Sequence, residues 1–276
     1  MALIELQDVS KRYGDREVLR HVNLQIEQGE FVSIVGASGS GKTTLVKVAA
    51  GLVQSDSGMV SVGSETVSGF PHGASIVFQN YSLLPWLSAL ENVRLAVESA
   101  FPDWSKTKHE EQAVKYLTMV GLGAALAKKP NQLSGGMRQR VAIARAFAVE
   151  PRVMFLDEPF GALDALTRAT LQQELARLCE AQTPRVTALM ITNSVDEAIL
   201  LSDRILALSR GPGASLSAAV PVTLTRPRAA DLMIHDEEAV RVRAHITEFL
   251  TANNSGARTR SKVPSKAADP VPVEVG

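Results

Sequence analysis

The sequence has a single cysteine, no long apolar run and no excess of charge of either sign. Cys179 therefore cannot form an internal disulfide, and a single cysteine fits a reducing cytosol. Its place in a predicted helix favours a residue without chemistry. No stretch of about 18 or more apolar residues occurs, so no transmembrane helix is predicted. Lysine plus arginine and aspartate plus glutamate number 29 each. This balance gives no support for nucleic-acid binding, which normally needs a basic face.

The first residues predict a β-strand and not a signal peptide. Glu5 and Asp8 interrupt the apolar residues that the core of a signal peptide would need. If the protein acts at a membrane, we therefore expect a partner to bring it there.

Strand and helix patterns alternate along most of the 276 residues. Strands are predicted over residues 3–9, 22–26, 31–35, 76–78, 153–156, 186–191 and 205–209. Helices are predicted over residues 42–50, 89–99, 107–120, 137–149, 167–179 and 195–201. This alternation implies a largely parallel sheet, and residues 82–148 predict an inserted helical subdomain. From about residue 251 the composition turns to Asn, Ser, Gly, Lys and Pro, which predicts a disordered tail.

A glycine-rich loop follows the predicted strand 31–35 and opens the helix after it. It fits the P-loop pattern G-x-x-x-x-G-K-[ST] with Gly36, Ala37, Ser38, Gly39, Ser40, Gly41, Lys42, Thr43 and Thr44. The glycines let successive backbone N–H groups point at nucleotide phosphates, and the helix dipole favours the same anion. We expect Lys42 to supply a charge to the phosphates and Thr43 a hydroxyl to Mg²⁺. A mere glycine turn with a surface lysine is the alternative.

Two carboxylates stand at the end of an apolar strand. Asp157 would be expensive to bury without a partner, and a contact to Mg²⁺ explains its position. Glu158 follows it, where it can orient or deprotonate the water that attacks the γ-phosphate. The alternative, two exposed loop acids, fits the preceding residues Val153–Leu156 poorly.

A third motif opens the predicted helix 137–149. Ser134 is a plausible N-cap, followed by Gly135 and Gly136. A plain helix start explains these residues, but the same N–H groups and hydroxyl can also bind an anion.

The three motifs, in this order, resemble the ATP-binding subunits of ABC transporters over about residues 4–227. The stretch 133–139 matches the family's signature without a gap, and other P-loop proteins lack it. The resemblance implies an α/β fold: a P-loop NTPase (RecA-like) core with a mostly parallel sheet, an N-terminal antiparallel β-subdomain and the inserted helical subdomain. We expect an ABC ATPase domain over residues 1–227, a C-terminal helical extension over 228–250 and the tail over 251–276.

The resemblance also implies roles for individual residues. Ser134, Gly135 and Gly136 would bind the γ-phosphate of ATP held by a second subunit. Tyr13 resembles the aromatic residue that stacks on adenine, although a lone tyrosine is more often a packing residue. Gln79 resembles the glutamine that touches Mg²⁺ and leads into the segment that contacts the membrane subunits. Trp86 in that segment is either exposed for docking or buried. Residues 161–164 resemble the loop through which paired subunits communicate.

One position departs from the family pattern. The family places a histidine after the strand 186–191, where this chain has Asn193. The asparagine amide can donate a hydrogen bond to the γ-phosphate, but it cannot be protonated. This departure puts the rate of turnover in question and leaves ATP binding intact.

The sequence therefore predicts an ATP-hydrolysing subunit of an importer. It would bind ATP and Mg²⁺, form a head-to-tail dimer with a copy or homologue, and drive separate transmembrane permease subunits at the cytoplasmic face of the membrane. A solute-binding protein would act indirectly, and the segments 79–93 and 155–164 resemble importers of nitrate, sulfonate, taurine or cyanate. Two alternatives remain: a slow or regulatory ABC subunit, suggested by Asn193, and a soluble ABC ATPase without a transport role.

Overall fold

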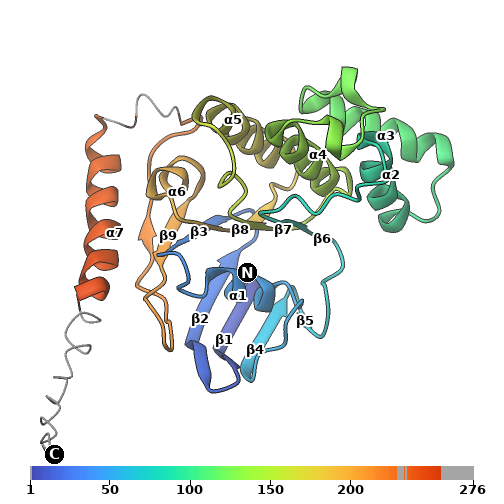
Figure 1. The fold of residues 1–276 in the computed structure, drawn as a ribbon. Helices are drawn as coiled ribbons and strands as arrows, with labels where there is room; N and C mark the ends of the chain where they lie inside the picture. The colour runs from blue at the N-terminus through green and yellow to red at the C-terminus, as the bar shows by residue number, and fades with distance from the viewer. Residues whose placement is uncertain (1, 229–232, 234, 256–276) are drawn as a thin grey trace, which may run out of the picture.

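Two β-sheets organise the chain, and helix α1 (Lys42–Ala49) lies between them (Figure 1). The computed structural model describes residues 2–228, 233 and 235–255. One buried apolar cluster joins the two sheets around α1, and a second lies between the larger sheet and the remaining helices. None of the helices in this part of the chain is long and apolar enough to cross a membrane.

The smaller sheet is antiparallel, with the strand order β2-β1-β4-β5. Its strands are β1 (Ala2–Tyr13), β2 (Arg16–Glu27), β4 (Ser57–Val62) and β5 (Glu65–Thr66). Gly14, with φ of 57°, and Asp15 form the turn between β1 and β2, so that Tyr13 stands opposite Arg16. This is the predicted N-terminal β-subdomain, and its first two strands are longer than the sequence pattern indicated.

The larger sheet has the strand order β10-β9-β3-β8-β7-β6, and only β10 runs antiparallel to its neighbour. Its strands are β3 (Phe31–Val35), β6 (Ala74–Val77), β7 (Val153–Asp157), β8 (Thr187–Thr192), β9 (Arg204–Ala207) and β10 (Val220–Pro221). Every residue of β3, β7 and β8 is buried, as expected for parallel strands covered on both faces. The neighbouring carboxyl ends of these three strands meet at one edge.

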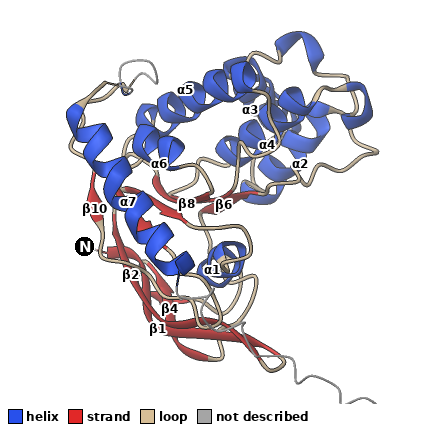
Figure 2. Ribbon diagram, turned by 60° about the vertical axis from the view of Figure 1, so that its left-hand side comes forward, coloured by secondary structure: helices blue, strands red, loops and turns tan. Residues whose placement is uncertain are grey.

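Helices α2 to α6 gather on the face of the larger sheet opposite to α1 (Figure 2). They are α2 (Ala89–Ala100), α3 (Lys106–Met119), α4 (Gly135–Ala148), α5 (Ala165–Ala181) and α6 (Val195–Leu201). Helices α2, α3 and α4 pack on one another as the predicted helical subdomain. The fold class is thereby confirmed. Cys179 is buried in α5, and this burial raises the pKa of its thiol to about 12, which makes it unreactive.

The C-terminal helix α7 (Glu237–Ser255) packs against α6 and β9. The predicted disordered tail starts at residue 251, but α7 continues to Ser255, so this boundary is wrong. The Thr251 hydroxyl donates to the carbonyl of Thr247, 2.9 Å away, inside the helix. A polar composition therefore did not prevent helix formation here. The rest of the predicted tail, residues 256–276, lies outside the described residues.

Candidate functional site

The glycine-rich loop connects β3 to α1 in a conformation that needs its glycines. Gly39 and Gly41 have φ of 76° and 106°. A Cβ atom on Gly41 would lie 2.9 Å from Cγ1 of Val18, and one on Gly36 would lie 2.8 Å from Oγ of Ser40. Side chains at positions 36 and 41 would fill the inside of the loop, and glycine at these positions leaves it open.

Lys42 is buried at the first turn of α1 and points back into this loop. Its Nζ donates hydrogen bonds to the carbonyls of Gly36 at 3.0 Å and Ala37 at 3.1 Å, and to Oδ1 of Asn193 at 2.7 Å. Oε1 of Glu158 lies 3.5 Å from the same nitrogen. Burial lowers the pKa of Lys42, and the charge of Glu158 acts against this shift. The ammonium group of Lys42 is thus held at the loop by neutral oxygen acceptors and by one carboxylate.

Asp157 ends β7 and is buried. Its Oδ1 accepts a hydrogen bond of 3.1 Å from the hydroxyl of Thr43, the residue after Lys42. Burial raises the pKa of Asp157, and the hydrogen bond from Thr43 opposes the rise. A hydroxyl and a carboxylate oxygen thus lie side by side at the base of the loop.

Glu158 adopts a left-handed backbone conformation, with φ of 45°, where β7 ends. Its N–H donates to the carbonyl of Ile191 in β8 at 3.0 Å. Its Oε2 accepts a hydrogen bond of 3.3 Å from Nε2 of Gln79, which follows β6. Two neighbouring strands and a third segment thereby aim this carboxylate at Lys42.

Lys42, Thr43, Gln79 and Glu158 border a cavity of about 370 Å³ at the carboxyl edge of the larger sheet. The lining residues are Tyr13, Arg16, Val18, Ser38, Gly39, Gly41, Lys42, Thr43, Thr44, Gln79 and Glu158. Tyr13 is 50% exposed, so it is not a packing residue in this chain. The sequence reasoning missed Arg16 and Val18. Their signal is the short hairpin turn, which sets Arg16 opposite Tyr13 and brings both to the loop.

The third motif does not line this cavity. Ser134 caps α4, and its Oγ accepts a hydrogen bond of 3.2 Å from the N–H of Met137. A Cβ on Gly136 would lie 2.4 Å from Cγ2 of Thr167, so the start of α4 packs closely on α5. Ser134 is exposed and Gly135 and Gly136 are half-buried, and a single chain does not bring them to the P-loop.

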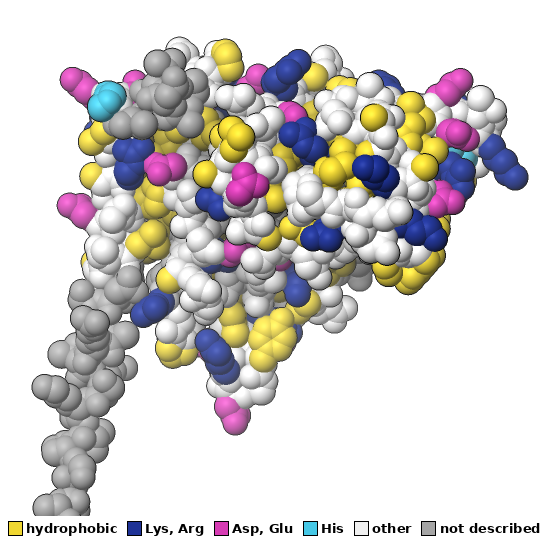
Figure 3. Space-filling view, turned by 45° about the horizontal axis from the view of Figure 1, so that its top comes forward, with side chains coloured by type: hydrophobic (Ala, Val, Ile, Leu, Met, Phe, Trp, Pro, Cys, Tyr) yellow, Lys and Arg dark blue, Asp and Glu magenta, His cyan; other side chains and the backbone are white. Residues whose placement is uncertain are grey.

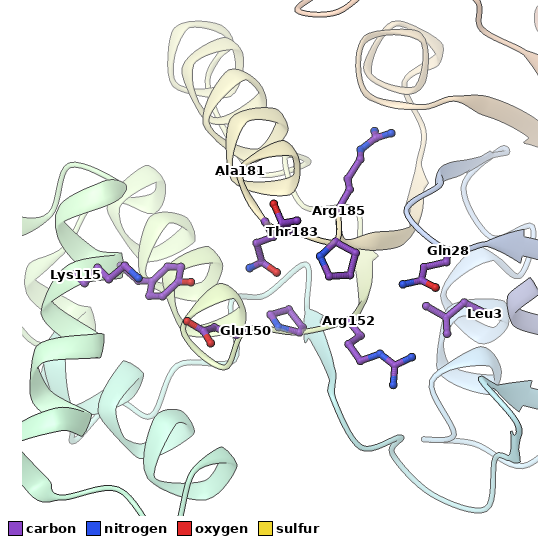
Figure 4. A pocket seen from close by; sticks show the side chains of 12 residues that line it. Leu3, Gln28, Lys115, Glu150, Arg152, Ala181, Thr183 and Arg185 are labelled. Atoms are coloured by element: carbon purple, nitrogen blue, oxygen red, sulfur yellow. The ribbon is translucent and has the colours of Figure 1, made fainter. Parts of the chain in front are cut away.

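A second cavity, of about 420 Å³, lies at the opposite edge of the larger sheet, where Arg152 precedes β7 and Arg185 precedes β8 (Figure 4). The side chains of Lys115, Arg152 and Arg185 point in different directions in Figure 4. The guanidinium of Arg185 pairs with Asp203 at 3.1 Å. The three basic side chains therefore do not converge on one anion, and the P-loop cavity is the candidate site.

A strand, a glycine loop and a helix that hold a buried lysine, beside a strand that ends in two carboxylates, define a P-loop nucleotide-binding protein. Comparison with known proteins gives the family. The ABC transporter family pattern matches residues 19–161. The chain belongs to the ABC transporter family.

Curated relatives of the chain are transport ATP-binding proteins. The bicarbonate transport ATP-binding protein CmpC of Synechocystis sp. is 43% identical over 90% of the chain, which spans only 37% of that relative. The bicarbonate transport ATP-binding protein CmpD of Synechocystis sp. is 42% identical, with 90% of this chain and 89% of CmpD covered. The nitrate import ATP-binding protein NrtD of Synechococcus elongatus is 42% identical, with 86% of each covered.

A solved structure shares the fold. The ATP-binding cassette MJ0796, determined as a dimer in a post-hydrolysis state with ADP and Pi, is 32% identical to the chain and superposes with a TM-score of 0.71. The match covers 80% of this chain and 100% of that one. This likeness confirms the P-loop NTPase fold.

Proposed function

We propose that the chain is the ATP-binding and hydrolysing subunit of an importer that takes up a small anion through separate permease subunits. The observation that carries this proposal is the convergence of Lys42, Asp157, Glu158 and Gln79 around one P-loop. The relatives whose names specify bicarbonate or nitrate support an anion of that kind. Transport would place the chain at the cytoplasmic face of a membrane, where its permease holds it.

The residues of the cavity fit a nucleotide with a divalent cation. Ser40 Oγ is buried and has no hydrogen-bond partner among the described residues, so a bound phosphate would satisfy it. Tyr13 offers an exposed ring for the base, and Lys42 offers its charge to the phosphates. Thr43, Asp157 and Gln79 would hold Mg²⁺, which would neutralise charge on the phosphate oxygens.

Glu158 is the proposed general base. Its carboxylate faces the loop and is positioned by Gln79, so it can accept a proton from water attacking the γ-phosphate. Asn193 would donate a hydrogen bond from its Nδ2 to the same phosphate, while its Oδ1 accepts one from Lys42. Lys42 also donates to the carbonyls of Gly36 and Ala37 in the loop.

A second copy or homologue would complete the site. Ser134, Gly135 and Gly136 lie outside the P-loop cavity of their own chain, which fits a role toward ATP held by another subunit. The dimeric state of MJ0796 supports this arrangement. The side chain of Trp86 is 65% exposed, so the alternative of a buried tryptophan is wrong. Its exposure supports permease docking through this segment. A solute-binding protein would contact the permease only.

The Lys42→Ala variant should bind ATP about 10- to 100-fold more weakly, because one hydrogen bond to a charged group contributes about 1.5–3 kcal/mol. Isothermal titration with ATP measures the change. Lys47→Ala is the control, since Lys47 lies on the same helix but does not line the cavity. Equal affinities of Lys42→Ala and wild type would remove Lys42 from the nucleotide site.

The Asn193→His variant should raise kcat about 5- to 30-fold with little change in ATP affinity. A charge-assisted hydrogen bond to the γ-phosphate is roughly twice as strong as a neutral one, and a gain of about 1–2 kcal/mol in the transition state gives this factor. Steady-state ATP hydrolysis of both proteins measures it. In the structure Asn193 accepts from Lys42, a role that a neutral histidine nitrogen can also fill. An equal or lower kcat would show that the site has adapted around asparagine.

ATP turnover of the purified chain, alone and with its permease, tests the proposed function. Turnover that rises with the permease supports an importer subunit. A turnover rate that does not change when the permease is added favours a soluble ABC ATPase. Nucleotide binding without turnover in either state favours the regulatory subunit that Asn193 suggests.

A further inference from the structure

Two consecutive residues after Gln79 have a backbone conformation that side chains rarely adopt. Tyr81 and Ser82 have φ of 64° and 46°, in the left-handed region, and neither is a glycine. Such residues persist where the surroundings hold them in place. The question is therefore what holds this loop.

Arg145, near the end of α4, holds it through the main chain. Its Nη1 donates to the carbonyl of Ser82 at 2.6 Å, and its Nη2 donates to the carbonyl of Tyr81 at 2.9 Å. Arg145 is half-buried, and among the described residues no carboxylate pairs with it. Both terminal nitrogens of the guanidinium therefore donate to carbonyls of the two left-handed residues.

The start of α4 touches the same loop. The guanidinium of Arg138 lies 5.5 Å from the centre of the Tyr81 ring. The Tyr81 hydroxyl would lie 3.5 Å from a Cβ on Gly135, in the signature motif. Helix α4 thus carries the signature at its first turn, and residues near both ends of this helix contact the loop.

The loop joins two functional positions. Gln79 precedes the two strained residues and donates to Glu158, and the exposed Trp86 follows them. We propose that Arg145 is a positioning residue that fixes Tyr81 and Ser82 in the left-handed conformation. It thereby holds Gln79 at Glu158. The part of this role that concerns hydrolysis rests on the proposed function.

Trp86 reports the state of the loop without any activity. The chain has two tryptophans, so Trp104→Phe leaves Trp86 as the only one. In that background, Arg145→Met should increase the amplitude of nanosecond motion in the fluorescence anisotropy decay of Trp86 about twofold, because the loop loses its anchor. Arg140→Met is the matched control. Arg140 also lies on α4, but it donates to the carbonyl of Val120 and pairs with Glu174, away from the loop.

A conservative variant separates positioning from general destabilisation. Arg145→Lys should lie between wild type and Arg145→Met, since lysine can donate to one carbonyl but lacks the planar fork. Unchanged Trp86 motion in Arg145→Met, or an equal change in Arg140→Met, would overturn the proposal.

Hydrolysis gives the second readout. Arg145→Met should lower kcat about tenfold or more and leave the Kd for ATP within about twofold, because a displaced Gln79 disturbs the catalytic geometry and not the P-loop. A loss of ATP binding equal to the loss of kcat would also overturn the proposal. If the wild-type chain binds ATP but never hydrolyses it, the proposed function fails, while the Trp86 measurement still decides the role of Arg145.

Discussion

Replacing Glu158 by glutamine should lower kcat for ATP by a factor of about 10² or more while ATP binding persists. A positioned general base contributes about 10²- to 10⁴-fold, and an amide cannot accept the proton. The replacement keeps the size of the side chain, and its amide oxygen can still accept the hydrogen bond from Gln79. Burst and steady-state measurements of phosphate release give kcat, and titration with ATP gives the Kd.

The control for this variant is Glu65→Gln, which removes an exposed carboxylate of β5 that does not line the P-loop cavity. It should hydrolyse ATP at the wild-type rate. Near-normal kcat in Glu158→Gln would remove Glu158 from the chemistry. The attacking water would then be activated by a group other than a carboxylate of this cavity, because no other carboxylate lines it among the described residues.

Ser134→Arg should abolish ATP-driven association and therefore turnover, yet leave ATP bound to the P-loop of each chain. The arginine places bulk and charge where the γ-phosphate of the opposing subunit is expected. It also removes the N-cap of α4, which costs about 1 kcal/mol of stability and does not by itself unfold a domain of this size. Turnover and ATP binding measured on one preparation separate the two effects.

Ser105→Arg is the matched control for the loss of the cap. Ser105 caps α3 with the same geometry, its Oγ accepting a hydrogen bond of 3.2 Å from the N–H of Lys108, and it is equally exposed. This control should keep turnover. Should Ser134→Arg lose ATP binding as completely as it loses turnover, the site would lie within one chain.

The parts of the site that are formed by continuous stretches of sequence could be predicted. The P-loop and the strand ending at Asp157 are local patterns, and the parallel sheet brings them together because β3 and β7 both flank β8. Contacts that depend on tertiary packing left no such pattern. The hydrogen bond from Lys42 to Asn193 joins residues 151 positions apart, and Arg16 reaches the cavity only through the register of a hairpin.

Other differences have similar causes. The hairpin of β4 and β5 escaped prediction because most of its residues are exposed or half-buried, so no apolar alternation marks it. The side chain of Trp86 is apolar but exposed, and the sequence alone does not tell whether this tryptophan is exposed or buried. Hydrophobic, basic and acidic side chains are mixed on the face in Figure 3, so charge alone does not mark a docking surface there. Arg145 gave no signal because its role depends on carbonyls more than 60 residues earlier in the chain.

The central claim is that the signature of one chain completes the ATP site of another. Light scattering of the Glu158→Gln variant with ATP, together with the nucleotide content of each peak, tests it most directly. The account predicts a dimer that holds one ATP per chain, a monomer without ATP, and a monomer that still binds ATP when Ser134→Arg is added. A Glu158→Gln chain that is saturated with ATP and remains a monomer, or a dimer that persists when Ser134→Arg is added, would contradict it.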